Sequence, residues 1–368
     1  MDKKYSSVHY HHYLQLEKIL DAQHPRSAEI EPKPAHDEML FIIVHQVYEL
    51  WFKQIIHELT SVIDMFRNEE VDERKTSVAV NRLERVTEIQ ELIIKQIDVM
   101  ETMTPLDFLD FRHYLFPASG FQSFQFRVVE ILIGLREKER LSYNKASFHV
   151  VFDDDKREYL RNLEADKSLL EVIENWLERI PFIAFGDFNF LEEYKKAVKR
   201  MLKKETESIM SSSILLEETK KLRLRMLGDT NTYFDSVLDP ERHKEYVASG
   251  ELKFSYRATI SALFIHLYRD EPILQLPYQL LAKIMHMEEL FTAWRSRHAQ
   301  MVLRMIGRKT GTGGSSGHEY LRNTAQKHQI FSDLFNISTL LIPRSELPKL
   351  PDDIIQKLGF HYTSTMKK

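Results

Sequence analysis

Two histidines on apolar helix faces are the residues of this chain that most invite a chemical explanation. His298 shares a predicted helix face with Met301, Val302 and Met305, at offsets of three, four and seven positions. His45 lies on a similar face in an earlier segment. A single histidine in such surroundings is more often a satisfied core residue than a ligand. Two of them also fit the opposite faces of a buried planar cofactor, because a neutral imidazole binds transition metals well.

Arg112 is the third residue whose place in the sequence is unusual. It belongs to a short predicted helix of mainly aromatic and aliphatic residues, and arginine is rarely buried without a partner. Asp107 or Asp110 could pair with it inside the protein. Alternatively, its planar guanidinium could bind an anionic group of a ligand, for which a carboxylate is the best geometric match. The sequence alone leaves both interpretations open.

A glycine-rich segment follows the helix of His298. Five of the chain's eleven glycines lie between positions 307 and 317. Successive glycines can direct backbone N–H groups at a phosphate, but a nucleotide-binding P-loop follows a strand and has a lysine after its glycines. Neither condition holds here. Gly307 is therefore expected to end the helix, with a surface loop after it.

A second group of histidines, His9, His11 and His12, lies near the N-terminus. Short histidine tracts are typical of metal binding. No acid or further histidine is placed to complete a coordination set, because a closed site usually needs four ligands. The group is therefore interpreted as the solvated start of a helix.

Composition excludes several classes of protein. The 368 residues are 43% hydrophobic, which is ample for a packed core, and contain no cysteine. Disulfides and cysteine-ligated metals are therefore excluded, and a metal or cofactor must be held by histidine, carboxylates or tyrosine. A net charge of −4 with interleaved signs argues against nucleic acid or an anionic membrane as a partner. The first residues do not read as a secretory signal, so a cytoplasmic location is expected.

The spacing of apolar residues predicts an all-α fold, with a single large helical-bundle domain over residues 1–368. Glycine and proline are scarce, and no Gly/Ser linker divides the chain. Asp37 is expected to cap a long helix that continues to residue 66, and Thr104 with Asp107 predicts a capping box. The other predicted regions are helices over 78–103 and 121–135, an N-terminal arm and helix over 1–35, a peripheral helical insertion over 140–250 and the loop over 307–317.

Three long blocks of the sequence resemble the signature blocks of the tryptophan 2,3-dioxygenase family. They read HDEMLFIIVHQVYELWFKQIIHEL, DFLDFRHYLFPASGFQSFQFRVVE and RHAQMVLRMIGRKTGTGGSSGHEYLR, in the family's order. The segments HYLQLEKILDAQ before them and FSDLFNISTLLIPR after them extend the resemblance over about residues 9–345. One departure is His11, where the family usually has a glycine after the tyrosine at position 10.

The resemblance implies an activity and a cofactor. The family opens the indole ring of L-tryptophan with O2 to give N-formyl-L-kynurenine, the first step of tryptophan catabolism by the kynurenine pathway. It uses a non-covalent haem b whose iron is Fe(II) in the active form, and it forms homotetramers. The alternatives are a haem monooxygenase of the same superfamily acting on another indole, a non-catalytic haem-binding protein, and a helical scaffold that binds a nucleotide.

The resemblance also implies roles for particular residues. His298 would be the proximal ligand of the haem iron, and His45 would be the distal, catalytic histidine. Arg112 would hold the substrate carboxylate, and Ser119 would lie near the haem edge. The glycine-rich loop over 307–317 would be a lid on the active site. The other expected substrate contacts are Phe41, Phe108, Thr312 and, from the N-terminal arm of a neighbouring subunit, Tyr10, Tyr13 and Leu14.

Overall fold

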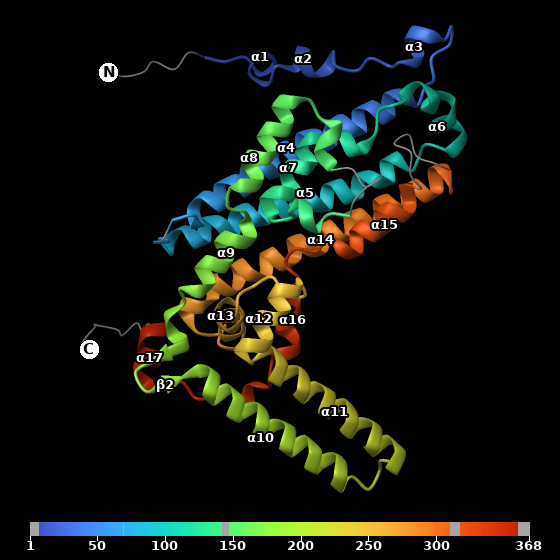
Figure 1. Ribbon diagram of the computed structural model, residues 1–368. Coiled ribbons are helices and arrows are strands. Elements are labelled where there is room, and N and C mark those ends of the chain that lie inside the picture. The colour runs from blue at the N-terminus through green and yellow to red at the C-terminus, as the bar shows by residue number, and fades with distance from the viewer. Residues whose placement is uncertain (1–6, 69, 142–146, 310–316, 360–368) are drawn as a thin grey trace, which may run out of the picture.

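Three long helices form the frame of the protein, which we describe from a computed structural model of residues 7–68, 70–141, 147–309 and 317–359. They are α4 (Glu38–Phe66), α5 (Arg74–Met100) and α14 (Gln275–Ile306). Helix α5 packs against both α4 and α14, and the three run side by side through one end of the molecule (Figure 1). The predicted all-α fold is confirmed.

Helix α4 forms because its apolar residues lie along one side, which packs against neighbouring helices. Phe52, Ile55 and Leu59 are almost completely buried on the side that faces α5 and the shorter helix α7 (Phe124–Ile133). Among the described residues, α4 is the one helix that is long and apolar enough to cross a membrane. Core helices of globular proteins meet the same criteria, and α4 packs against α5 and α7 along one side.

The start of α4 differs from the expected cap. Asp37 occupies the predicted N-cap position, but its side chain makes no capping hydrogen bond, so the position is confirmed and the side-chain cap is not. The carboxylate of Glu38 instead accepts the backbone N–H groups of Arg26 at 2.7 Å and Ser27 at 2.9 Å. The buried carboxylate therefore ties the N-terminal arm to the helix, which a local capping pattern does not reveal.

Helix α6 (Pro105–Arg112) begins as predicted. The Thr104 hydroxyl accepts the N–H of Asp107, and the Asp107 carboxylate accepts the N–H of Thr104 at 3.0 Å, which completes a capping box. The helix predicted over 121–135 is shorter in the structure. A 3-10 turn, η2 (Gly120–Gln122), comes first, and α7 begins after Ser123, whose hydroxyl accepts the N–H of Phe126.

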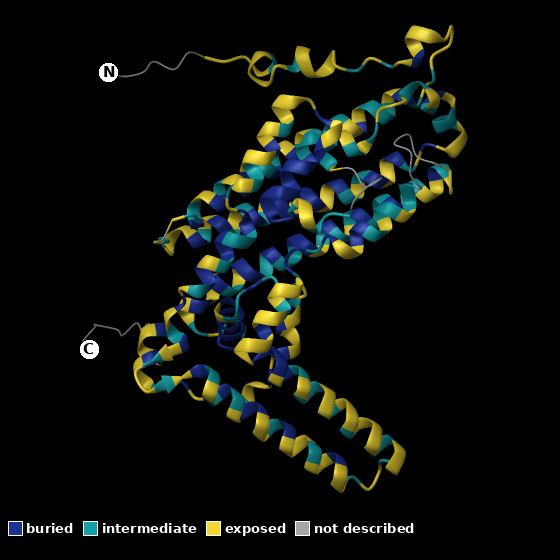
Figure 2. Cartoon of the chain, viewed as in Figure 1, coloured by how far each residue is buried: buried dark blue, intermediate teal, exposed yellow. Residues whose placement is uncertain are grey.

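A second bundle of helices forms around α13 (Tyr256–Leu267), which is buried on nearly every side and shares one hydrophobic core with the frame. It packs against α9 (Leu169–Glu178) and α16 (Ser332–Ile337). Two long helices, α10 (Phe190–Ser211) and α11 (Glu217–Val237), project from this bundle as an antiparallel pair (Figure 1). Much of their surface is exposed (Figure 2).

The remaining elements are short or peripheral. The other α-helices are α1 (Tyr10–Leu14), α2 (Leu16–Leu20), α3 (Ser27–Ile30), α8 (Asp154–Ala165), α12 (Pro240–Ser249), α15 (Gly317–Lys327) and α17 (Asp352–Leu358). The other 3-10 helices are η1 (His113–Leu115), η3 (Glu137–Glu139), η4 (Phe148–Val151), η5 (Pro181–Ile183), η6 (Pro272–Leu274), η7 (Ser338–Leu340) and η8 (Arg344–Glu346). The strands are β1 (Ala184–Phe185) and β2 (Phe188–Asn189), which pair antiparallel.

The predicted organisation can be compared with these elements. Helices α1 to α3 run outside the frame as an exposed arm (Figures 1 and 2). Within 140–250, α10 and α11 are peripheral, whereas α9 packs against α4 and α13. The division of the chain into these regions stays a prediction. Helix α14 ends at Gly307, whose φ of 61° suits glycine, as expected.

Gly134 gives a test of the packing beside α7. Its φ is 125°, and a β-carbon there would lie 2.9 Å from Cβ of Leu170. Gly134→Ala should therefore lower the free energy of unfolding by about 2–4 kcal/mol, through backbone strain and overpacking together. Urea unfolding measures the change. Gly228→Ala is the control, because Gly228 lies within α11 with open space around its β-position and should stabilise the helix.

Candidate functional site

One cavity brings together residues from six helices and a turn. It is lined by α4, α5, α6, α7, α14 and α15 and by residues between Ser119 and Ser123. Five of the predicted site residues line it, namely His45, Phe108, Arg112, Ser119 and His298. Phe41 lies beside it, with its ring 4.1 Å from that of His45 and 5.8 Å from that of Phe108. Residues separated by more than 250 positions therefore meet at one site.

His45 is held in one tautomer by its own helix. Its Nδ1 lies 2.7 Å from the carbonyl oxygen of Phe41, one turn earlier. A carbonyl oxygen only accepts hydrogen bonds, so Nδ1 carries the proton and, in the neutral ring, Nε2 is an acceptor. The His45 side chain is exposed and lines the cavity, and desolvation by the protein around it lowers the pKa of the ring. Neutral His45 therefore offers an acceptor nitrogen.

His298 is also neutral at physiological pH. Burial, with a smaller contribution from repulsion by His45, lowers the pKa of His298 to about 4. One turn earlier on α14, the ring of Trp294 stacks against the imidazole with centroids 5.3 Å apart. Trp294 is in turn held edge-on by Phe52. Aromatic packing thus fixes an imidazole that can serve as a metal ligand.

Arg112 lies at the end of α6, where its side chain lines the cavity. The Asp107 carboxylate, one of the two acids considered as its partner, is used in the capping box with Thr104. Asp110, the other acid, is exposed. The hydroxyl of Ser119 accepts the N–H of Phe121 at 3.4 Å and caps the next turn. Short helices with local caps therefore present Arg112 and Ser119 to the cavity.

A buried charge cluster, which the sequence analysis missed, borders the same cavity. The Glu130 carboxylate accepts hydrogen bonds from Arg127 at 2.7 Å, Arg140 at 2.5 Å and Arg295 at 3.1 Å. All four side chains are less than 10% exposed. Burial alone would raise the pKa of Glu130, but the positive charges of Arg127 and Arg140 outweigh it and hold that pKa well below its usual range.

The cluster has a surplus of positive charge, since three guanidiniums share one carboxylate. The Nε atoms of Arg127 and Arg140 have no hydrogen-bond partner among the described residues. Arg127, Glu130 and Arg295 all line the cavity. The cavity therefore suits a ligand with anionic groups. A local signal existed in the sequence, because Arg127 and Glu130 interrupt the apolar segment FQFRVVEILIGL.

The other predicted site residues do not line this cavity in the described part of the chain. Tyr10 and Tyr13 lie on α1 and are 71% and 72% exposed, and Leu14 is 37% exposed. Thr312 lies outside the described residues, as does most of the glycine-rich loop. The cavity of one chain thus contains the residues expected to bind haem and the substrate carboxylate. The residues of the N-terminal arm lie apart from it.

Fold and cavity define the class of the protein, an all-α ligand-binding protein whose internal cavity joins neutral imidazoles to arginines. Comparison with known proteins narrows this class. The chain matches the family model for tryptophan 2,3-dioxygenase over residues 1–341. It therefore belongs to the tryptophan 2,3-dioxygenase family, which confirms the resemblance.

Three relatives carry the name tryptophan 2,3-dioxygenase. The protein from Bdellovibrio bacteriovorus is 48% identical, over 98% of this chain and 100% of its own length. The protein from Alteromonas mediterranea is 45% identical, over 98% and 99%. The protein from Dictyostelium discoideum is 42% identical, over 97% and 89%. The similarity therefore extends over almost the whole chain, including the segments that form the cavity.

The charge cluster gives a prediction on stability. Glu130→Gln should lower the free energy of unfolding at pH 7 by about 3–5 kcal/mol, because three buried guanidiniums lose their shared carboxylate. Urea unfolding measures the loss. Glu289→Gln is the control, because Glu289 is exposed on α14 and its replacement should change stability by less than about 0.5 kcal/mol.

The pH dependence distinguishes loss of the carboxylate charge from loss of packing. The folded-state pKa of Glu130 lies below that of an unfolded chain, which is about 4.3. Its stabilising contribution is therefore complete above that pH and is lost as pH falls through the folded-state pKa. Stability should fall more steeply between about pH 5 and about pH 3 in the unaltered protein than in Glu130→Gln. Equal slopes would contradict the assignment.

Proposed function

We propose that this protein is a haem-dependent dioxygenase that opens the indole ring of L-tryptophan with O2. The product is N-formyl-L-kynurenine, so the reaction is the first step of tryptophan catabolism by the kynurenine pathway. Family membership supports the reaction. The single observation that carries the proposal is the pair of neutral imidazoles, His45 and His298, on two helices of one cavity.

The cavity residues fit a non-covalent haem b. His298, kept unprotonated by burial, would be the proximal ligand of the iron. The surplus positive charge around Glu130 fits the two carboxylates of haem. The Nε of Arg127, which has no hydrogen-bond partner among the described residues, supports the same assignment. Ser119 would lie near the haem edge. When bound, the ferrous cofactor supplies the site at which O2 is bound and activated.

Arg112 would select an amino acid over free indole. Its guanidinium can form a bidentate pair with the substrate carboxylate, and a hydrogen bond of this charged kind contributes about 1.5–3 kcal/mol. Phe108 would pack against the indole ring, with Phe41 behind it. Their stacked rings give a flat apolar wall, which suits an aromatic side chain.

His45 would position the substrate. Its Nδ1–H donates to the Phe41 carbonyl, so Nε2 can accept the N–H of the indole ring. The lowered pKa of His45 keeps this acceptor available at neutral pH. A single hydrogen bond at this point would hold the indole in one orientation in the cavity, close to the geometry in which it reacts. Orientation is therefore its proposed contribution.

The arm residues fit a site shared between subunits. Tyr10, Tyr13 and Leu14 are exposed on α1 and apart from the cavity of their own chain. We infer that they enter the cavity of a neighbouring copy in a homotetramer. Thr312 would contact the amino-acid end of the substrate. A cytoplasmic location and the ferrous state of the active enzyme belong to the same proposal.

Two variants separate cofactor binding from substrate binding. His298→Ala should lose tightly held haem, because the iron loses its protein ligand, and the Soret absorbance of the purified protein measures this loss. Arg112→Ala should keep the haem and raise KM for L-tryptophan roughly 10- to 150-fold, the equivalent of one charged hydrogen bond. Full haem occupancy in His298→Ala would refute the ligand assignment.

The product of a single turnover distinguishes the activities. The protein is reduced without oxygen, then mixed with O2 and L-tryptophan, and the products are separated by mass. N-Formylkynurenine, which carries two added oxygen atoms, is the expected result. A mono-hydroxylated indole would indicate the monooxygenase, and a Soret band without any product would indicate a non-catalytic haem protein.

A further inference from the structure

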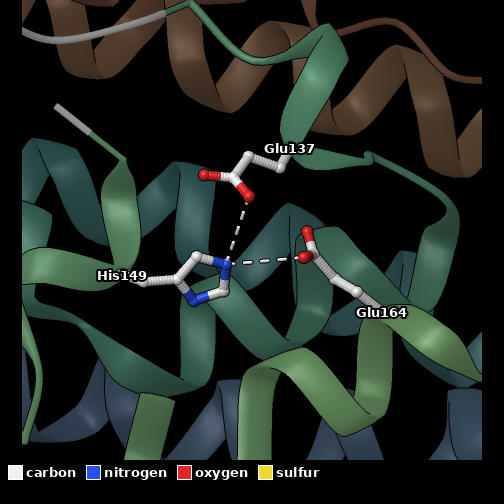
Figure 3. Close-up of side chains that lie close together, drawn as sticks. All are labelled: Glu137, His149 and Glu164. Atoms are coloured by element: carbon white, nitrogen blue, oxygen red, sulfur yellow. Dashed lines mark ion pairs between the residues drawn. The ribbon is translucent and has the colours of Figure 1, made fainter. Parts of the chain in front are cut away.

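A second group of metal-ligating side chains lies away from the cavity, where η3, η4 and α8 meet (Figure 3). Its members are Glu137, His149 and Glu164, whose ligand atoms all lie within 4.8 Å of one another. Nε2 of His149 lies 3.8 Å from a carboxylate oxygen of Glu137 and 3.4 Å from one of Glu164. Within the described ranges, this is the one group of three such residues with this spacing.

The imidazole of His149 is buried without the hydrogen bonds that burial normally requires. The residue is 3% exposed, and neither ring nitrogen has a hydrogen-bond partner among the described residues. Oε1 of Glu164 is also buried and unpartnered in that part of the chain. Figure 3 shows the ring pointing between the two carboxylates. Buried polar atoms without partners are costly, so this arrangement calls for a further atom between the three side chains.

The neighbouring arginines, Arg136 and Arg140, bind other groups than the carboxylates of Glu137 and Glu164. Arg136 donates to the backbone oxygens of Glu164 at 2.6 Å and Asp166 at 3.0 Å, and to the carboxylate of Glu171 at 2.5 Å. Arg140 binds the Glu130 carboxylate and lies over the ring of Phe148, 4.2 Å from its centroid. The two carboxylates that face His149 therefore meet an imidazole rather than a guanidinium.

We propose that Glu137, His149 and Glu164 bind a divalent first-row transition metal ion, with Zn²⁺ as the best match. One nitrogen and two carboxylate oxygens suit Zn²⁺, whereas Mg²⁺ and Ca²⁺ prefer oxygen alone. Two carboxylates with a neutral imidazole carry two negative charges, which the ion balances. The side chain of Glu137 is 49% exposed, so water can reach the ion and complete its coordination.

The observed spacing is close to what zinc needs. Ligands at about 2.1 Å in a tetrahedral arrangement lie about 3.4 Å from one another. The two distances from His149 Nε2, 3.4 and 3.8 Å, are near that value. The third pair, the carboxylate oxygens of Glu137 and Glu164, lies within 4.8 Å, and rotation of the half-exposed Glu137 side chain would bring its oxygen closer to the other two ligands. His149 and Glu164 already have the spacing that zinc needs before the ion binds.

The expected role of the ion is structural. It would tie together η3, η4 and α8, three short segments that contribute one ligand each. Helix η4 packs against η2, the turn capped by Ser119 at the cavity. The ion would therefore stabilise the outer support of the cavity wall. This inference concerns a separate site and does not depend on the proposed activity.

Calorimetric titration with ZnCl2 tests the proposal on the haem-loaded protein after treatment with a chelator. We expect tight binding that Glu164→Gln weakens at least 100-fold. The matched control is Glu158→Gln, an exposed position on the same helix, which should bind zinc like the unaltered protein. Zinc on the N-terminal histidines would be the same in both variants, so the difference between them reports this site alone.

X-ray absorption at the zinc edge adds the ligand identity, because the haem iron does not contribute there. We expect one imidazole and carboxylate oxygens at about 2.0–2.1 Å, with the imidazole signal lost in His149→Gln. If Glu164→Gln or His149→Gln fails to fold, the half-exposed Glu137→Gln replaces it. This variant should weaken zinc binding in the calorimetric titration and lose one carboxylate oxygen in the absorption spectrum.

Two results would overturn the proposal. One is zinc binding by Glu164→Gln or Glu137→Gln that equals that of the unaltered protein. The other is a melting temperature that zinc leaves unchanged in the unaltered protein, together with a lower one in His149→Gln. That pattern would indicate a protonated His149 that bridges two carboxylates without a metal ion.

Discussion

The neutrality of two imidazoles is the physical condition on which the site depends. In the proposed reaction His298 would bind iron and His45 would accept an N–H. An imidazolium can do neither, so both rings would have to be unprotonated at physiological pH. Desolvation by the surrounding protein favours this state, since it lowers the pKa of both rings and brings that of His298 to about 4, although the His45 side chain itself remains exposed. The frame of α4, α5 and α14 supplies that desolvation, because it surrounds the cavity with protein on long, rigid helices.

The same low-dielectric interior holds a charge cluster that links distant parts of the chain. Arg295 of α14 binds Glu130 of α7 and donates a second hydrogen bond to the backbone oxygen of His328, at 2.9 Å. The three segments are thereby joined beside the cavity. Since the cluster has more positive than negative charge, it would compensate for an anionic ligand while the imidazoles nearby remain neutral. Under this proposal stability and ligand recognition would depend on the same residues.

The sequence predicts the parts of this structure that depend on local patterns. Apolar spacing locates α4 and α14, and the capping box at Thr104 is a signal within four residues. Asp37 takes the N-cap position without a side-chain cap, and the neighbouring Glu38 binds the distant backbone at Arg26 and Ser27, which a local pattern does not predict. Pairs such as Glu130 with Arg295, 165 positions apart, follow from tertiary packing and leave no periodic trace. Spacing alone also left the roles of the histidines open, and the family resemblance supplied them.

The most direct test of the account is a crystal structure of the protein loaded with ferrous haem and L-tryptophan in the absence of oxygen. The account predicts that the His298 imidazole binds the iron. It places the indole on the other face of the haem, with its N–H directed at Nε2 of His45 and the carboxylate on Arg112. Iron held by any other side chain, with the His298 ring turned away from the haem, would contradict it.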